Sequence, residues 1–253
     1  MRGPSIPGAL WRALRAVGHV IRGLWIIWRQ FDHITAQARV EHVRRWSQQM
    51  LAILGVQLVV KGNVPAKGPC LVVSNHISWL DILVLNAAQP LRFVSKADVR
   101  HWPVLGALVT GAGTLYIERE RRRDAMRVVH HMAEGLKNGD LIAVFPEGTT
   151  GDGRELLPFH GNLIQAAIAV HAPILPVSLS FMDGRTGGHS DAPAYVGDDH
   201  LVGSVWRTLR DGAVQAVVHF GTAEYADGRD RRVWAHDLRE VVASLREPRA
   251  AKS

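Results

Sequence analysis

Hydrophobic positions in the first thirty-one residues recur every three or four residues. Such a period places apolar side chains along one stripe of a helix. The stripe consists of Leu10, Leu14, Val17, Ile21, Leu24, Trp28 and Phe31. At roughly 100° per residue, the arginines at 12, 15, 22 and 29 fall on other faces. A second amphipathic stretch, residues 35–54, is predicted to fold back on the first and to end at Gly55.

From residue 56 onward, short apolar runs alternate with helical stretches. Strands are predicted at 56–62, 70–74, 91–97, 114–119, 141–145, 174–181 and 214–220. Helices are predicted at 78–88, 97–110 with an interruption at Pro103, 124–137, 161–171, 201–210 and 231–246, and an exposed loop at 182–194. This alternation predicts a largely parallel sheet flanked by helices. We therefore expect an α/β domain over residues 56–253, preceded by an amphipathic two-helix segment over residues 1–55.

The first segment has the pattern of a helix that lies in the plane of a membrane. Its longest uninterrupted apolar run, "LWIIW", is far shorter than the ~20 residues that a bilayer-spanning helix needs. Trp11, Trp25 and Trp28 accompany the apolar stripe, and arginines occupy the other faces. That arrangement is typical of interfacial helices. Packing against the protein's own core is the alternative, and we favour an anionic membrane surface as the partner.

Composition and charge narrow the classes of protein further. With 47% hydrophobic and 21% charged residues, the 253-residue chain is expected to fold. Thirty Lys and Arg against 23 Asp and Glu leave a net charge of +7, which suits an anionic partner. The single cysteine, Cys70, excludes a disulfide framework and a four-cysteine zinc site. The chain has no GxGxxG, Walker or GxSxG motif, so nucleotide binding and serine hydrolysis lack support.

Chemically active side chains stand where the strand at 70–74 ends, in "SNHISWLDI". If His76 lies just before the following helix and Asp81 in its first turns, the carboxylate can reach back to one ring nitrogen. The other nitrogen is then free to take a proton. A histidine that merely caps the turn is the alternative for this segment alone.

Two further strand ends carry polar groups. The segment 113–123, "GTLYIERERRR", ends a strand at Arg119, where guanidinium groups suit a phosphate. For the arginines at 121–123 we favour a solvated first helical turn. In "VFPEGTTGDG" a buried strand breaks at Pro146 and is followed by a tight loop that contains Glu147 and Gly148. Backbone N–H groups in such a loop could hold an oxyanion or a phosphate.

In this order, the three segments resemble the glycerolipid acyltransferase family, specifically its bacterial 1-acyl-sn-glycerol-3-phosphate acyltransferase type. The resemblance covers about residues 56–225. Its NHxxxxD block matches Asn75, His76 and Asp81, its G-x-x-[FY]-I-x-R block matches Gly113, Tyr116, Ile117 and Arg119, and its FPEGT block matches Phe145 through Thr149. The family's lysine-containing segment matches Lys96 with 103–106, and its proline block matches Pro176.

The resemblance implies acyl transfer from a thioester donor to the free hydroxyl of 1-acyl-sn-glycerol-3-phosphate, giving phosphatidic acid. His76 would be the general base and Asp81 would orient it. Substrate binding is expected from Asn75, Lys96, Gly113, Arg119, Glu147, Gly148 and Thr149, with possible contributions from Thr150, His160 and Pro176. Arg119 and Glu147 would hold the acceptor head group, and N–H groups near Gly148 would hold the oxyanion. Acyl-CoA or acyl carrier protein would be the co-substrate, with no cofactor and no metal, at the cytoplasmic face of the inner membrane.

Two positions depart from the family pattern. Thr150 stands where many members have Arg, and His160 stands where they have Lys. Both changes remove positive charge, so an acyltransferase for lyso-ornithine lipid, whose acceptor carries no phosphate, is the alternative. A membrane-surface adaptor without catalysis is the non-enzyme alternative. Nucleic-acid binding is not expected, because no such motif accompanies the arginines. A metal-dependent hydrolase is disfavoured, because HxxxH and HxH spacings are absent.

Overall fold

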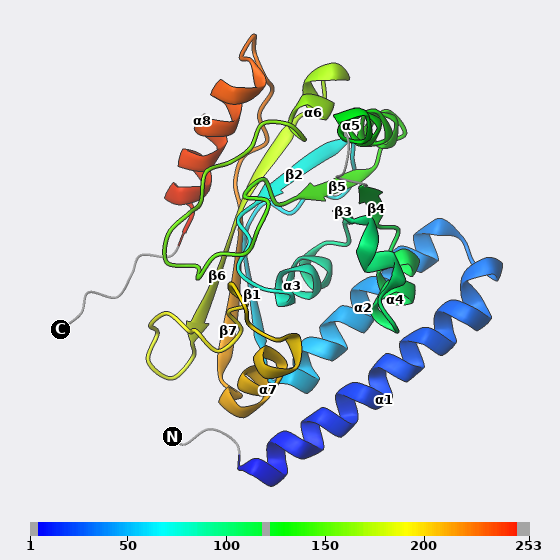
Figure 1. Cartoon of the computed structure of the whole chain (residues 1–253), viewed down its shortest axis with the longest axis vertical. Helices are drawn as coiled ribbons and strands as arrows, with labels where there is room; N and C mark the ends of the chain where they lie inside the picture. Colours follow the sequence, from blue (N-terminus) through cyan, green and yellow to red (C-terminus); the bar gives the residue numbers. More distant parts are fainter. Residues whose placement is uncertain (1–4, 118–121, 247–253) are drawn as a thin grey trace.

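A seven-stranded sheet runs through the described part of the chain, residues 5–117 and 122–246 of this computed structural model (Figure 1). Its strands lie in the order β1-β7-β6-β2-β5-β3-β4. Their bounds are β1 Gln57–Gly62, β2 Cys70–Ser74, β3 Arg92–Lys96, β4 Leu115–Ile117, β5 Leu141–Val144, β6 Ile174–Asp183 and β7 Val214–Phe220. All neighbouring strands are parallel except β6 and β7. The predicted largely parallel sheet is confirmed.

The antiparallel pairing of β6 and β7 follows from the connection between them. After β6, a loop and helix α7 (Leu201–Asp211) stay at the end of the sheet where β6 stops. Strand β7 therefore runs back along β6, pairing Asp183 with Val214 and Val177 with Phe220. No crossover carries the chain to the other end, which a parallel pair would require.

Helices cover both faces of the sheet (Figure 1). One face carries α1 (Ile6–Gln30), α2 (Ala36–Leu54), α3 (Leu80–Ala88) and α7, and the other carries α5 (Arg122–Lys137), α6 (Gln165–Ala169) and α8 (Arg231–Ser244). Strand β2 is apolar along most of its length because it lies between two hydrophobic cores. Val72 packs into the first core and Val73 into the second, because successive side chains of a strand point to opposite faces. The chain also forms α4 (Leu105–Gly111) and the short 3-10 helices η1 (Phe31–His33) and η2 (Ala97–His101).

Helices α1 and α2 form the predicted hairpin, and α2 ends at Gly55, whose φ of +77° suits a glycine. The rings of His19 and Trp46 stack at 4.9 Å between their centroids. Each donates to the other's backbone carbonyl, at 2.9 Å from His19 Nε2 and 3.1 Å from Trp46 Nε1. Burial lowers the pKa of His19. This reciprocal contact fastens α1 to α2 with directional bonds.

Helix α1 packs on the core with one side and exposes another side. Its inner side packs into the first core through Ala9, Ala13, Ala16 and Val20. Most of the predicted apolar stripe is exposed instead, from Leu10 to Trp28, whereas Phe31 is buried and Leu24 is half-buried. None of the helices in the described residues is long and apolar enough to cross a bilayer.

Two predicted segments differ from the structure. The helix expected at 161–171 shortens to α6, and Gly161 lies so close to the backbone of Arg231 that an added Cβ would sit 2.3 Å from its carbonyl oxygen. The loop at 182–194 is exposed around residues 184–187, but its later part is held against the loop that follows β2. Ser78 Oγ donates to Pro193 O at 2.5 Å, and Tyr195 N donates to Ile77 O at 3.3 Å.

Candidate active site

The loops that follow β2 and β5 meet at the carboxyl end of these two neighbouring strands. The two strands are parallel neighbours in register, with Val73 beside Val144, so their carboxyl ends lie together. His76 follows β2, and Glu147 follows β5. Ligand sites in open α/β sheets form at such strand ends. Two motifs that lie 71 residues apart in sequence thus share one site.

His76 and Asp81 form a hydrogen-bonded pair. His76 Nδ1 lies 2.7 Å from Asp81 Oδ2, and the Asp81 side chain is fully buried. The same oxygen accepts the backbone N–H groups of Ile77 at 2.6 Å and Ser78 at 2.9 Å. These contacts exist because α3 begins only at Leu80, so the chain turns between the two residues instead of continuing as a helix. A carboxylate only accepts, so His76 Nδ1 carries the proton and Nε2 is left as an acceptor.

A ring and a carboxylate hold His76 from two further directions. The ring of Phe145 stacks on the imidazole, with centroids 4.0 Å apart and planes 8° apart. The carboxylate of Glu147 accepts the backbone N–H of His76 at 3.0 Å. The backbone carbonyl of His76 accepts the N–H of Gly151 at 2.8 Å. The histidine side chain nevertheless keeps 20% of its surface exposed. It is therefore held in one orientation and remains reachable.

Glu147 is placed differently from the sequence expectation. It was expected to hold an acceptor head group, yet the residue is buried and both of its carboxylate oxygens accept backbone donors, from His76 and, at 3.1 Å, from Leu157. Burial, the largest influence, raises its pKa to about 7. The side chain therefore lies between the loop after β2 and the segment at Leu157. Glu147 ties these two segments together.

Asn75 and Gly148 also differ from the expected roles in binding. The Asn75 amide exchanges two hydrogen bonds with the backbone of Leu179, at 2.9 and 2.8 Å, and extends the pairing of β2 with β6. Gly148 has a φ of +73°, and its N–H donates to Phe145 O at 3.1 Å, so this donor is already used inside the turn. Of the backbone N–H groups near Gly148 that are expected to hold the oxyanion, that of Gly148 itself is therefore occupied.

The remaining predicted residues are spread around this centre. Thr149 and Lys96 are exposed, the latter at the end of β3, and Pro176 is buried in β6 beside Val73. Gly113, at a φ of +80°, accepts the Arg92 side chain at its carbonyl, and the prediction for Arg119 lies outside the described residues. His160 is exposed, with its ring near Gly148. The Thr150 hydroxyl donates to the carbonyl of Tyr195.

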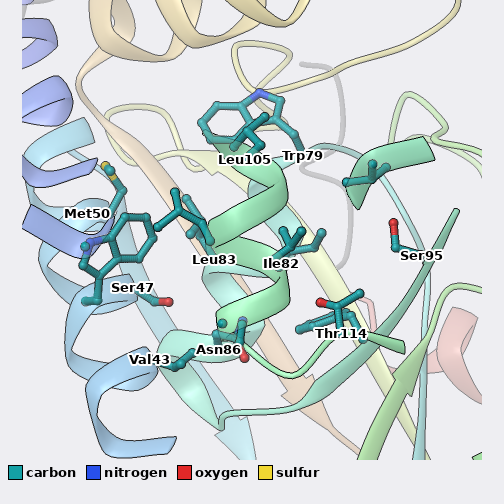
Figure 2. A pocket seen from close by; sticks show the side chains of 18 of the residues that line it. Val43, Ser47, Met50, Trp79, Ile82, Leu83, Asn86, Ser95, Leu105 and Thr114 are labelled. Carbon is teal, nitrogen blue, oxygen red and sulfur yellow. The ribbon is translucent and has the colours of Figure 1, made fainter. Parts of the chain in front are cut away.

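An apolar pocket of about 480 Å³ opens beside His76. Its walls come from α1, α2, α3, α4, α7 and β3, and include Met50, Trp79, Ile82 and Leu83 (Figure 2). Lys, Arg, Asp and Glu are all missing from the described residues that line it. Sequence reasoning identified His76 and missed these wall residues. Their only signal was that the stretches at 35–54 and 78–88 carry apolar side chains, which does not say what those side chains face.

Comparison with known proteins identifies acyltransferases among the relatives of this chain. The family model described as Acyltransferase matches residues 56–180. A lyso-ornithine lipid O-acyltransferase of Pseudomonas aeruginosa is 36% identical over 92% of this chain and 91% of its own length. A 1-acyl-sn-glycerol-3-phosphate acyltransferase of Neisseria meningitidis is 33% identical over 86% of this chain and 85% of its own length.

The fold has a counterpart among solved structures. The 1-acyl-sn-glycerophosphate acyltransferase PlsC of Thermotoga maritima superposes with a TM-score of 0.65, covering 94% of this chain and all of that one at 19% identity. At that identity the likeness concerns the fold alone. The relatives of high coverage carry the wider inference: this chain belongs to the glycerolipid acyltransferase family.

Proposed function

We propose that this chain transfers a fatty acyl group from a thioester donor, acyl-CoA or acyl carrier protein, to the free hydroxyl of a lysolipid. The observation that carries this proposal is the oriented His76–Asp81 pair at an apolar pocket. A base beside the pocket can take the proton of the acceptor hydroxyl, and the apolar pocket can hold a hydrocarbon chain. Family membership supports acyl transfer as the reaction class.

In the proposed mechanism, His76 acts through Nε2. This nitrogen takes the proton of the acceptor hydroxyl as its oxygen attacks the thioester carbonyl. Asp81 stabilises the imidazolium that forms, because its carboxylate is bonded to Nδ1 at 2.7 Å. The tetrahedral intermediate then expels the thiolate, which takes the proton back from His76. An ester bond forms, a thioester bond breaks, and the base is regenerated without an acyl-enzyme.

Two acceptors are candidates. The motif resemblance and the Neisseria relative support 1-acyl-sn-glycerol-3-phosphate, with phosphatidic acid as product. Two other observations favour lyso-ornithine lipid. The Pseudomonas relative covers slightly more of this chain, and Thr150 and His160 supply no permanent positive charge where a phosphate would need one. We propose lyso-ornithine lipid as the first acceptor and the phosphate acceptor as the second.

We also propose that α1 holds the enzyme on an anionic membrane leaflet, at the cytoplasmic face of the inner membrane. Its exposed stripe includes Leu14, Ile21 and Trp28, each more than half exposed. Arginines at 15, 22 and 29 are exposed on other faces of the helix, whereas Arg12 packs against Gly55 at the end of α2. Apolar burial together with attraction to anionic lipids is how interfacial helices bind. Lysolipid acceptors reside in such a surface.

A paired acyl-transfer assay tests the reaction and the acceptor together. Purified protein in detergent receives a labelled acyl thioester with either lyso-ornithine lipid or 1-acylglycerol-3-phosphate, and His76→Ala is run beside each. We expect product from lyso-ornithine lipid that depends on His76. Product from the phosphate acceptor alone would make the second candidate the function. No product from either acceptor, with folded protein, would overturn the enzymatic proposal and favour a membrane adaptor.

A matched variant sharpens the choice of acceptor. Thr150→Arg places a cation at the pocket lining, where the wild-type hydroxyl bonds to Tyr195. We expect it to raise the ratio of phosphate-acceptor to ornithine-acceptor turnover. An unchanged ratio would show that residue 150 does not take part in recognising the head group.

A further inference from the structure

Helix α1 presents three different sides. One flank meets α2 through the His19–Trp46 contact and through Arg12, whose guanidinium packs over Gly55. The next side meets α4, because a Cβ added at Gly111 would lie 2.7 Å from Ile27, and Gly23 lies between the two helices, since its added Cβ would be 2.5 Å from Trp46 and 3.3 Å from Leu108. Counted at about 100° per residue, the exposed apolar stripe lies next to the flank occupied by α4 and away from the flank occupied by α2.

The turn that leads into α4 carries its own exposed apolar tip, residues 102–104. Trp102 and Val104 are each 47% exposed. Three backbone hydrogen bonds brace the tip: Trp102 N to Val99 O, Leu105 N to Pro103 O and Gly106 N to Trp102 O, at 3.2, 2.7 and 2.9 Å. The closed turn thus leaves two large apolar side chains about half exposed.

Val104 adopts a backbone conformation that its side chain disfavours. Its φ is +68°, and a β-branched residue at positive φ is a genuine outlier. Glycine or asparagine would satisfy this turn with less strain. Such strain persists where the surrounding structure over-determines it, and it is a reason to look for a function. Here the strained position bears an exposed valine instead of a residue that would relieve it.

The charges around the tip suit an anionic lipid surface. Lys96 at the end of β3 and Arg100 in η2 are exposed in the segment that leads to the tip and outnumber the exposed Asp98. Tryptophan prefers the boundary between headgroups and hydrocarbon, since its ring is apolar and its N–H is polar. We propose that the tip at 102–104 is a second element that enters the anionic membrane surface beside α1. This rests on the proposed membrane attachment of α1, and it extends the contact to the pocket wall, because Trp102 also lines the pocket.

Environment-sensitive labels test the proposal on the full chain. Val104→Cys, Trp28→Cys and Met126→Cys are each labelled with a nitrobenzoxadiazole dye, with Cys70 buried and therefore protected. Met126 is the matched control, since it is 76% exposed on α5, which covers the opposite face of the sheet. On adding phosphatidylglycerol vesicles, we expect the emission at positions 104 and 28 to shift to the blue and to gain intensity. Position 126 stays unchanged.

The outcomes separate the two proposals. A shift at position 28 without one at 104 would overturn the tip proposal and leave the attachment by α1 intact. No shift at either would overturn membrane attachment itself. A shift at 104 caused by an acidic carrier protein without vesicles would assign the tip to a protein partner and likewise overturn the proposal. As a second measurement, Val104→Asp is expected to lower the vesicle-bound fraction several-fold while turnover on detergent-dispersed substrate stays unchanged, since Val104 is not part of the pocket lining.

Discussion

The loops after β2 and β5 and the apolar pocket beside them are held by different forces. In the loops, almost every polar atom near His76 has a directional partner: Asp81 Oδ2 accepts three donors and Glu147 accepts two. The pocket walls are held mainly by apolar packing between helices, which has no preferred direction, although the His19–Trp46 bonds join α1 to α2. Proton transfer requires one geometry, whereas a hydrocarbon chain requires volume. Substitutions in the loops should therefore lower the turnover rate, and substitutions in the pocket should change the length of the acyl chain that is preferred.

Removing the base should have the largest effect. Because His76 Nε2 is the proposed proton acceptor, His76→Ala is expected to lower kcat about 10³-fold. The thermal midpoint should stay close to that of the wild type, since the imidazole side chain is partly exposed and packs mainly on Phe145. The measurement is steady-state acyl transfer beside a melting curve. A variant within tenfold of wild-type activity would remove His76 from the chemistry.

Asp81→Asn should have the next largest effect. The amide oxygen can take the place of Oδ2 and accept the same three donors, while the amide nitrogen occupies the position of Oδ1, which is buried and has no hydrogen-bond partner. The fold should survive, but the charge that supports the imidazolium is lost, so kcat should fall about 10²-fold with little change in KM. Asp81→Ala is the comparison, and it should also unfold more easily because three donors lose their acceptor. Full activity of Asp81→Asn would limit the residue to a structural role.

Glu147→Gln tests whether this carboxylate positions His76 or binds the acceptor. Glutamine would set its NH2 group against one of two backbone donors, and the displaced loop should lower kcat roughly 10- to 100-fold. The KM for the acceptor should change little. A raised KM for the acceptor with an unchanged kcat would show that Glu147 binds the acceptor head group instead of positioning His76.

The pH dependence of stability should change in the same variant. The pKa of Glu147 in the folded state is raised from 4.5 to about 7, so its stabilising contribution is fully present below pH 4.5 and is lost as pH rises through about 7. At 1.36 kcal/mol per pKa unit, the difference corresponds to about 3 kcal/mol of unfolding free energy. Glutamine does not titrate, so the wild type should lose stability relative to the variant between pH 4.5 and 8.5, as measured by urea unfolding. An equal difference at both pH values would contradict the buried, titrating carboxylate.

The pocket should respond with the smallest change in rate and with a change in specificity. Leu83→Phe fills part of the space that Leu83 and Ile82 border, so the ratio of long-chain to short-chain turnover should fall roughly five- to tenfold. Turnover of the shortest chain should remain near the wild-type value. A panel of acyl thioesters of increasing length measures this, with Met126→Phe on the opposite face as control. A uniform loss across the panel would indicate misfolding or damage to the catalytic loops.

Much of the fold could be predicted from periodicity, because strands and helices bury side chains at different intervals. Six of the seven strands of the described chain lie within their predicted segments, and β6 runs two residues beyond its own, to Asp183. Their order could not be predicted, and neither could the antiparallel β6–β7 pair, because pairing depends on where each connection returns. For Glu147, sequence indicated the loop and not the direction of the side chain. That direction depends on the backbone donors of His76 and Leu157, which lie 71 and 10 residues away.

The sequence by itself determined the alternating elements, the stripe of α1 and the presence of a histidine and a carboxylate at one strand end. These follow from local spacing and from the chemistry of single residues. Only the tertiary structure decided that β2 and β5 are neighbours, that Glu147 braces His76, and that α1 and α2 help to enclose an apolar pocket beside it. The reason is physical: each of these features is a contact between segments that are distant along the chain, and it exists only once both cores have packed.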